Sequence, residues 1–299
     1  MKVINTYYNP LGRIFKLELE TSDIIECTEM RTVAEEFLDL KMPEIYKHIT
    51  PFEKVWILDL STQIGCPQKC IFCDIPVKTK FKRNLTADEM FEQFKFLIEN
   101  TDYVKSCKKL RVYFARMGEP LYNVENILSA ISKIKGYISS SKKDFNATYH
   151  VSTMMPSQTF EGESNESALL KLLNEDVEVT ISMTTLNEKD RDKYYVSNYA
   201  SVKQILDIIE KKPKETVIKL SLISIKGAKY SYDVLRRLSA IPKLTVRVTN
   251  CCANVNTIDN GLEDNNLSEL EIFKSIGIDT ETLFVPYYKN YGLSCGQFL

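Results

Sequence analysis

Three cysteines in the stretch STQIGCPQKCIFC give the first indication of chemistry in this chain: Cys66, Cys70 and Cys73. Three residues separate the first pair and two separate the second. Protein iron–sulfur clusters are normally held by four cysteine thiolates. Three thiolates on one tight loop can hold three irons of a four-iron, four-sulfur (4Fe–4S) cluster, which leaves the fourth iron open. The spacing therefore predicts a cluster that can bind a substrate or cofactor at its open iron.

A zinc site and a disulfide framework are the alternatives for these cysteines. Zinc sites combine closely spaced cysteines with a second pair or with histidines. No second pair follows at a matching distance, and the two histidines, His48 and His150, are not a spaced pair. A disulfide framework fits poorly because the chain is long and has no secretory signal. A zinc-stabilised binding module without enzymatic activity is the hypothesis that iron analysis would exclude.

Length and composition indicate a globular α/β protein. The chain has 299 residues, of which 44% are hydrophobic and 26% are charged, enough for one large domain. The net charge of −1 gives no global basic field for nucleic acid. Without a signal core or an apolar run of membrane-spanning length, we expect a cytoplasmic protein that does not enter a membrane. The eight cysteines are then expected to be reduced.

Residues 1–53 are predicted to form a small N-terminal, β-rich leader. Strands are expected at residues 12–19 and 24–30, with Thr21-Ser22-Asp23 as the turn between them. A helical stretch is expected at residues 33–40, and Pro43 is expected to end it. This leader contains no catalytic motif.

Residues 54–299 alternate short β-rich runs with helical patterns, which predicts a parallel sheet with right-handed crossovers. Strands are expected at residues 55–63, 110–115, 147–152, 177–183, 216–223, 244–249 and 282–285. Helices are expected at residues 87–97, 124–134, 166–173, 202–209, 232–239 and 267–275. Six such units favour an open, partial (β/α)6 TIM-like barrel. Because chemistry lies at the C-terminal ends of the strands in such folds, the cysteine loop after the first strand is in the expected place.

The cysteine spacing resembles the signature of radical S-adenosylmethionine (SAM) enzymes. These enzymes bind SAM at the open iron and release a 5′-deoxyadenosyl radical from it. Gly118 and Glu119 follow the second predicted strand, where glycine lets backbone carbonyls approach the SAM ammonium closely. Read alone, the same residues are equally typical of a strand-to-helix turn with Asn123 as the helix N-cap.

Hydroxyl groups follow the third and fourth predicted strands, with Ser152 and Ser182 as candidate contacts for the SAM carboxylate or ribose. Plain loop capping is nearly as good an explanation for each of them. After the sixth strand, Asn250 and Asn254 are both able to reach SAM, and spacing does not choose between them. Asn250 is the candidate carried forward.

The chain ends in GLSCGQFL, which places Cys295 between small residues. Glycine neighbours let a thiol enter a site closely, whereas a frayed, exposed terminus would give the same pattern. The residues alone leave these two interpretations open.

Taken together, these motifs resemble the RlmN/Cfr family of radical SAM enzymes, which methylate a ring carbon of an adenine in ribosomal RNA. The similarity begins near Gly12 and includes GRIFKLELETSDIIE, STQIGCPQKCIFC, FKRNLTADE, MGEPLYN, VSTMMPS, ISMTTLNEKDR and the CGQ ending. The cysteine loop alone indicates the superfamily, whereas RNLTADE, GEPLYN and CGQ are more specific.

The resemblance implies a cluster on Cys66, Cys70 and Cys73, SAM contacts from Glu119, Ser152 and Ser182, and a methyl carrier at Cys295. In the family, one SAM methylates the carrier cysteine, and a radical from a second SAM takes hydrogen from the S-methyl group. The carbon radical adds to an electron-poor aromatic carbon, and a second cysteine opens the covalent link by forming a disulfide with the carrier. A low-potential reductant such as flavodoxin or ferredoxin is the implied partner.

The chain departs from this pattern at the position of the second cysteine, seven residues before Cys66, which is Asp59. A carboxylate can accept a proton from the adduct, but it cannot form a disulfide. Either the adduct resolves differently or another thiol replaces this cysteine, with the candidates Cys27, Cys107, Cys251 and Cys252.

Two further departures concern the substrate. The family has an N-terminal helical domain that helps to hold RNA, and this chain begins at about the strand pair that follows it. The family also has a histidine where this chain has Thr184. Because the chain is near neutral, we expect it to act on something other than the ribosome.

The sequence therefore predicts a radical SAM enzyme, a class A type C-methyltransferase, that moves a one-carbon unit through Cys295. The expected acceptor is an sp2 carbon of a small molecule, nucleotide or peptide rather than of ribosomal RNA. The alternative is a relative that uses the 5′-deoxyadenosyl radical for a rearrangement or oxidation without methylation. Asp59 motivates this alternative, and substrate conversion without a one-carbon gain would select it.

Overall fold

The computed structural model describes residues 1–33, 44–157, 164–195, 198–251 and 255–283. Ten strands form one sheet in the order β1-β2-β3-β4-β7-β8-β9-β10-β11-β12. Their bounds are β1 Lys2–Asn9, β2 Gly12–Glu18, β3 Ile24–Met30, β4 Trp56–Leu60, β7 Ser106–Phe114, β8 Asp144–Thr153, β9 Val177–Thr184, β10 Ile218–Ser224, β11 Leu244–Asn250 and β12 Asp279–Leu283.

Within this sheet, neighbouring strands from β4 through β7 to β12 pair in parallel, whereas β1, β2, β3 and β4 pair antiparallel. Among the described strands, β1 and β12 are the two edges and no pairing joins them. The predicted open, partial barrel is therefore confirmed.

The leader adds three strands to the same sheet. The strands predicted at residues 12–19 and 24–30 are β2 and β3, and β1 precedes them without having been predicted. Most of the helix predicted at residues 33–40 lies outside the described residues. Because β3 pairs with β4, the leader continues the sheet on which the rest of the chain is built.

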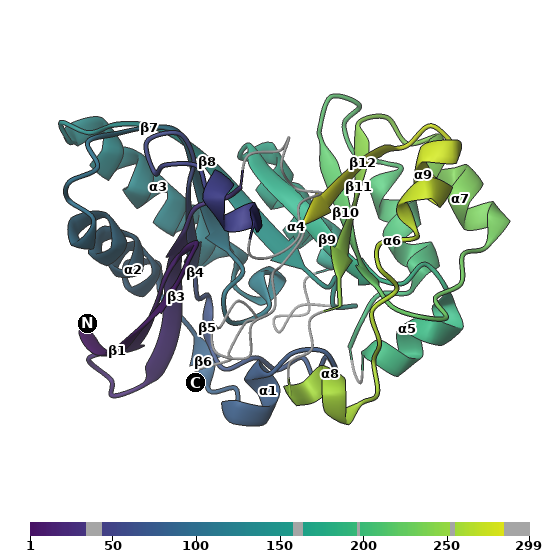
Figure 1. Cartoon of the computed structure of the whole chain (residues 1–299), viewed down its shortest axis with the longest axis horizontal. Helices are drawn as coiled ribbons and strands as arrows, with labels where there is room; N and C mark the ends of the chain where they lie inside the picture. The colour runs from purple at the N-terminus through teal and green to yellow at the C-terminus, as the bar shows by residue number, and fades with distance from the viewer. Residues whose placement is uncertain (34–43, 158–163, 196–197, 252–254, 284–299) are drawn as a thin grey trace.

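Helices α2, α3, α6, α7 and α9 lie outside the curve of the sheet (Figure 1). The helices predicted in this part of the chain are confirmed in type and approximate position. The helices are α1 Ile75–Lys78, α2 Ala87–Asn100, α3 Val124–Ser140, α4 Asn165–Asn174, α5 Glu188–Tyr194, α6 Val202–Ile209, α7 Tyr232–Ser239, α8 Val255–Asp259 and α9 Leu270–Ser275, with 3-10 turns η2 Glu44–His48 and η3 Pro120–Tyr122.

The two faces of the sheet follow from the alternation of side chains along each strand. On β4, Trp56, Leu58 and Leu60 are fully buried in the main hydrophobic core. Ile57 and Asp59 point to the opposite face and are half-buried. We call the face that packs on the helices the outer face and the concave opposite face the inner face.

The C-terminal ends of the parallel strands lie at one end of the molecule, and the site is expected there. The short hairpin of β5 Gln63–Ile64 and β6 Arg83–Asn84 follows β4 there. Helices α1 and α8 lie beside each other at this end (Figure 1), and an Asn256 to Asp74 hydrogen bond connects them.

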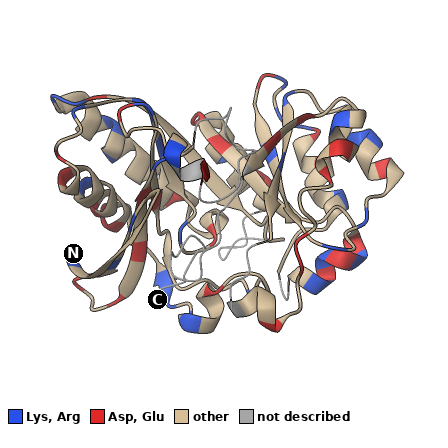
Figure 2. Ribbon diagram, in the orientation of Figure 1, with Lys and Arg blue, Asp and Glu red and all other residues tan. Residues whose placement is uncertain are grey.

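Basic and acidic residues are intermixed on the helices, and α5 carries charges of both signs within its 7 residues (Figure 2). Among the described helices, none has both the length and the apolar character that a membrane span requires.

Candidate functional site

The three predicted cluster ligands lie on one loop that the β5–β6 hairpin closes. Cys66, Cys70 and Cys73 are half-buried, and the Cys73 N–H donates to the Cys70 carbonyl at 3.1 Å. Burial raises the pKa of the Cys70 thiol well above its ordinary value, and the neighbouring Cys73 and Cys66 add to the effect. Since thiolates bind metals and thiols do not, metal uptake at this loop must release protons.

Gly65 gives the loop its sharp entry. Its φ is +71°, and a Cβ at this position would lie 2.4 Å from the Lys80 carbonyl oxygen. Both the left-handed backbone and the close approach of Lys80 exclude a side chain here. The glycine before the first cysteine therefore sets the path of the loop.

Two asparagines from the region after β11 hold the loop from the other side. The Asn256 side-chain amide donates to the Cys73 carbonyl at 2.8 Å, and the Asn256 N–H donates to Asp74 Oδ1 at 3.2 Å. The Asn260 amide donates to the Ile71 carbonyl at 3.3 Å. The sequence analysis missed both residues because these contacts join segments more than 180 positions apart.

Gly118 and Glu119 lie against the start of this loop. Gly118 has φ +113°, and a Cβ on it would lie 2.6 Å from Thr62 Oγ1 and 2.8 Å from the Gln63 side chain. The Glu119 N–H donates to Gln63 Oε1 at 2.8 Å. The predicted SAM motif and the cysteine loop are thus in direct contact.

The Glu119 carboxylate is buried and already accepts three protein hydrogen bonds. Leu121 N–H and Met154 N–H each donate to it at 3.0 Å, and the Thr153 hydroxyl is the third donor. Burial raises the pKa of Glu119 to about 7, while the three donors oppose this shift. A carboxylate has about four acceptor positions, so one position is left for a further donor such as an ammonium.

Ser152 and Ser182 come together at the ends of β8 and β9 on the inner face. Their hydroxyl oxygens are 3.3 Å apart, and both side chains are half-buried. Asn250 is the last residue of β11 and is also half-buried. Asn254 and Cys295 lie outside the described residues.

Asp59 lies on the inner face of β4, directly opposite Thr28 of β3 and Tyr113 of β7. Its Oδ1 accepts the Ala115 N–H at 3.2 Å. Burial raises the pKa of Asp59 to about 7, whereas Arg116 and the Ala115 N–H act in the opposite direction. Near neutral pH, this carboxyl group is poised to exchange a proton.

The described thiols outside the loop are at three different places. Cys27 packs in the main core, on the face opposite to Asp59, and the Cys107 thiol donates to the Phe52 carbonyl at the start of β7. Cys251 follows β11 and packs in a small apolar cluster with Cys70. Burial and the nearby Asp264 raise the pKa of Cys251 to about 11. Of the described thiols outside the loop, only Cys251 lies at the end of the sheet where the loop lies.

A row of polar side chains crosses the middle of the inner face. The Tyr113 and His150 rings stack with centroids 4.4 Å apart, and His150 Nδ1 is 3.4 Å from Glu178 Oε2. Further along, Lys219 and Arg247 pair with Glu281 at 3.4 and 2.6 Å. Burial, together with three nearby cations, lowers the pKa of His150 to about 3, so this imidazole stays neutral. The inner face is polar where a closed barrel would carry a packed apolar centre.

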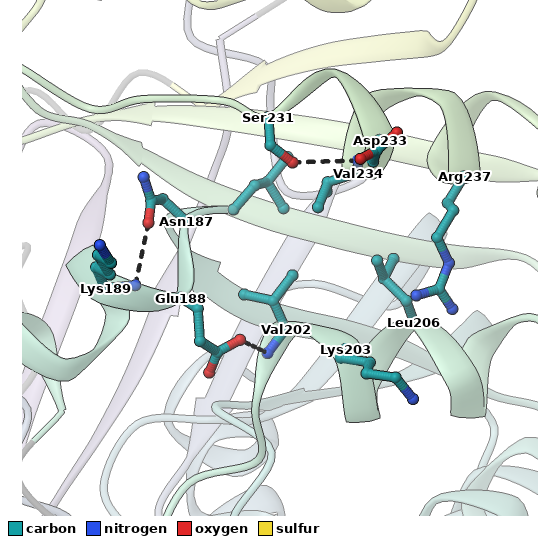
Figure 3. Close-up of a pocket in the computed structure, with 11 residues that line it drawn as sticks. Asn187, Glu188, Lys189, Val202, Lys203, Leu206, Ser231, Asp233, Val234 and Arg237 are labelled. Carbon is teal, nitrogen blue, oxygen red and sulfur yellow. Dashed lines mark hydrogen bonds between the residues drawn. The ribbon is translucent and has the colours of Figure 1, made fainter.

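A cavity of about 530 Å³ lies elsewhere, between α5, α6 and α7 (Figure 3). Its polar groups serve as helix caps: Asn187 accepts the Lys189 N–H, Glu188 accepts the Val202 N–H, and Ser231 accepts the Val234 N–H. None of the predicted site residues lines it. The candidate site is therefore the end of the sheet at which the cysteine loop lies.

The residues at this end fit a cluster with one open iron. Their donor set is the three thiols of one loop, and Gly118 packs against Thr62 and Gln63 at the start of that loop. No three His, Cys, Asp or Glu side chains of the described segments converge to hold a single metal ion. The cysteines of a cluster each bind a different iron, so the loop does not need that convergence.

Comparisons with known proteins agree with this geometry. Curated relatives include dual-specificity RNA methyltransferases RlmN from Helicobacter hepaticus, 29% identical over 80% of this chain and 60% of the relative, and from Sulfurimonas denitrificans, 26% identical over 86% and 70%. The chain thus spans about 60% of the length of the first relative.

A solved radical SAM methyltransferase from Sphaerobacter thermophilus superposes with a TM-score of 0.71 at 15% identity, over 99% of this chain and 80% of that chain. The likeness shows that the two chains share a fold. The family model of the radical SAM superfamily matches residues 60–227, which is more than half of the chain and includes the cysteine loop. The chain therefore belongs to the radical SAM superfamily.

Proposed function

We propose that Cys66, Cys70 and Cys73 hold a 4Fe–4S cluster whose fourth iron is open to SAM. The observation that carries this proposal is the meeting of three features at one end of the sheet. These are the three cysteines on one loop, the glycine at position 118 against the start of that loop, and the paired hydroxyls of Ser152 and Ser182.

The proposed SAM contacts follow from the hydrogen-bond donors and acceptors that each group can still provide. Gly118 lets the backbone approach SAM closely, and Glu119 keeps one acceptor position for the SAM ammonium. Ser152 and Ser182 offer neighbouring hydroxyl donors to the carboxylate or ribose, and Asn250 offers an amide from the end of β11. With the cluster and SAM bound, one electron from an external donor such as flavodoxin or ferredoxin would break the bond between sulfur and the 5′ carbon of SAM, which would give methionine and a 5′-deoxyadenosyl radical.

We further propose that the enzyme transfers a one-carbon unit through Cys295. The CGQ ending of the chain and the names of its methyltransferase relatives support this carrier role. The proposed acceptor is an sp2 carbon of a small molecule, nucleotide or peptide. The net charge of −1 and the intermixed surface charges (Figure 2) favour such acceptors over ribosomal RNA.

Asp59 is the proposed proton acceptor of this reaction. It lies on the inner face, its pKa is about 7, and one of its oxygens has no hydrogen bond from the described residues. A base with such a pKa can take a proton from a substrate carbon near neutral pH and release it again.

A second candidate function is a radical reaction without methyl transfer. The observation that favours it is the carboxylate at position 59, together with the positions of Cys27 and Cys107 away from the site. In that case SAM would serve as the radical source alone, and Asp59 would act on a substrate proton during rearrangement or oxidation.

The test of the carrier role uses SAM itself as the probe. The full chain is purified without oxygen, reconstituted with iron and sulfide, and incubated with deuteromethyl-labelled SAM and dithionite. We expect the peptide that contains Cys295 to gain one labelled methyl group on sulfur. The Cys295→Ala variant should keep the cluster and lose the label, whereas Cys107→Ala is the matched control that keeps both.

Two other outcomes are informative. An unlabelled Cys295 peptide from protein that still cleaves SAM would overturn the carrier role and select the second function. Protein that binds zinc and takes up no iron would overturn both.

A further inference from the structure

Arg191 of α5 is fully buried, and three backbone carbonyls accept its hydrogen bonds. Its Nε donates to the Ala200 carbonyl at 2.8 Å, its Nη1 to Met183 at 2.9 Å and its Nη2 to Met154 at 2.9 Å. These carbonyls follow β8, end β9 and precede α6. The guanidinium therefore ties together the chain segments at the end of the sheet where the cysteine loop lies.

This cation has no carboxylate partner among the described residues. Its neighbours on α5 have partners of their own: Asp190 pairs with Lys193 at 2.7 Å, and Asp192 accepts the Tyr199 hydroxyl. A buried charge without a counter-charge is costly unless it is strongly solvated by hydrogen bonds. By contrast, the other fully enclosed arginine at this end, Arg116, pairs with Glu26 at 2.6 Å.

A short stack of rings connects Arg191 to the cysteine loop. The guanidinium lies 4.5 Å from the centroid of the Tyr195 ring. The Phe72 ring meets Tyr195 edge-on, with centroids 5.8 Å apart, and Phe72 lies between Cys70 and Cys73 in the sequence. The Ile71 N–H also donates to the Tyr194 carbonyl at 3.1 Å, so the end of α5 rests directly on the loop.

The space between Arg191 and the loop is apolar. Tyr194, Tyr195, Met154 and Cys251 form a buried cluster, and Cys70, Ile71 and Phe72 pack against it. A charge acts over a longer distance in such surroundings than in water.

The cluster itself would supply the counter-charge that the described residues do not provide. An oxidised 4Fe–4S core with three thiolates carries one net negative charge, which becomes two when the cluster accepts an electron. Net charge, hydrogen bonds and exposure set the reduction potential of such clusters. A fixed cation nearby stabilises the reduced form more than the oxidised form.

We propose that Arg191 is the fixed counter-charge of the iron–sulfur cluster and that it raises the reduction potential of the cluster through the Tyr195–Phe72 stack. No bond forms or breaks in this role, since the cluster accepts one electron from the external donor while Arg191 keeps its proton. Arg191 is a positioning residue, because its side chain reaches the loop through Tyr195. The inference rests on the proposed cluster at Cys66, Cys70 and Cys73.

The test is a potentiometric titration of the reconstituted full-length protein with dithionite, followed by electron paramagnetic resonance. Arg191→Gln removes the charge and keeps two N–H donors for the carbonyls. We expect it to bind iron and sulfide as wild type does, with a reduction potential shifted to more negative values. Arg191→Lys should stay closer to wild type. Arg237→Gln, a change in a partly exposed arginine of α7 that pairs with Asp207 and Glu210, is the control that leaves the potential unchanged.

A second pair of variants leaves Arg191 and its hydrogen bonds in place. The ring of half-buried Tyr199 lies 5.7 Å from the guanidinium. Tyr199→Glu brings a carboxylate to the arginine and should also shift the potential to more negative values, whereas Tyr199→Gln is its neutral control. This pair tests the effect of Arg191 on the reduction potential even if the Arg191 variants do not fold.

The outcomes separate the two proposals. Wild-type protein without iron and sulfide would overturn the proposed cluster site. Cluster-loaded Arg191→Gln and Tyr199→Glu with the potential of wild type would overturn the role of Arg191 alone.

Discussion

The inner and outer faces of the sheet are built from the same strands but differ in the residues they carry. On β7, Phe114 points to the outer face and is fully buried in the core. Its neighbour Tyr113 points to the inner face, where it stacks on His150. The alternation of strand side chains thus lets one segment stabilise the fold with one set of residues and shape the site with the other. Substitutions on the two faces should therefore be felt in different measurements.

The largest expected effect is on the outer face. Phe114→Ala should lower the free energy of unfolding by about 3–5 kcal/mol, because it removes a large buried side chain and leaves a cavity. Tyr113→Ala, one residue away, should cost only about 1–2 kcal/mol, since a half-buried ring and one stacking contact are lost. Denaturant unfolding of the two variants at equal cluster content measures the difference. Equal losses would show that the inner face also carries the stability of the fold.

An intermediate effect is expected at His150, which is neutral in the fold with a pKa of about 3. In the unfolded chain, a histidine binds a proton below a pH of about 6.5. The folded protein therefore loses stability as the pH falls from about 6.5 toward 3, by about 2 kcal/mol at pH 5. The His150→Gln variant lacks this loss, so its free energy of unfolding should fall less steeply between pH 7 and pH 5.

The slope in this comparison separates the titration of His150 from its packing. Loss of the stack with Tyr113 lowers the stability of His150→Gln at every pH, whereas the proton effect appears only below about pH 6.5. Parallel curves for the variant and wild type would contradict a neutral buried imidazole.

The smallest expected effect on stability is at Asp59, and its sign is opposite to that of Phe114→Ala. A carboxyl group with a pKa of about 7 in the fold binds a proton more tightly there than in the unfolded chain. Its contribution to stability is therefore lost as the pH rises from about 4 through 7. The rise in pKa from about 4 to about 7 corresponds to about 4 kcal/mol of stability lost by pH 8. Asp59→Asn should recover only about 1 kcal/mol of it, because the amide that replaces the carboxyl group brings N–H donors of its own to the same enclosed place.

The catalytic activity of Asp59→Asn should fall, although its stability at pH 8 should rise. We expect the variant to keep its cluster and its cleavage of SAM, because Asp59 is neither a proposed cluster ligand nor a proposed SAM contact. Turnover of substrate should fall, since the proposed proton acceptor is gone. A variant that is less stable at pH 8 than wild type would contradict the burial of a charged carboxyl group at position 59.

The sequence predicted the outer face better than the inner one. The buried strands from β4 to β11 were found because apolar residues recur at every second position, as in Leu58 and Leu60. The strand β1 was missed because its residues, KVINTYYN, show no alternation of apolar and polar side chains, and it lies largely exposed at the edge of the sheet. The helix α5 was missed for the same reason, since EKDRDKY has no apolar stripe.

The candidate site was predicted in outline, because the spacing of the three cysteines and their place after a strand are local features. The environment of each side chain was not. The three donors to Glu119 come from its own turn and from the end of β8, and Asn256 reaches the loop from the far end of the chain. Arg191 stood within the motif ISMTTLNEKDR, yet nothing local showed that it would be buried with no carboxylate partner in the described part of the chain. Such features depend on tertiary packing, which no short pattern records.

The hydrogen bonds around Glu119 have one further consequence. Gln63 accepts the Glu119 N–H, Glu119 accepts the Met154 N–H, and the Met154 carbonyl accepts Arg191. This relay joins the ends of β4, β7, β8 and β9 before any cofactor arrives. The conformational entropy of these loops is therefore lost when the chain folds rather than when SAM binds. The affinity for SAM then depends on the contacts between SAM and the protein, because little free energy is lost in ordering the loops when SAM binds.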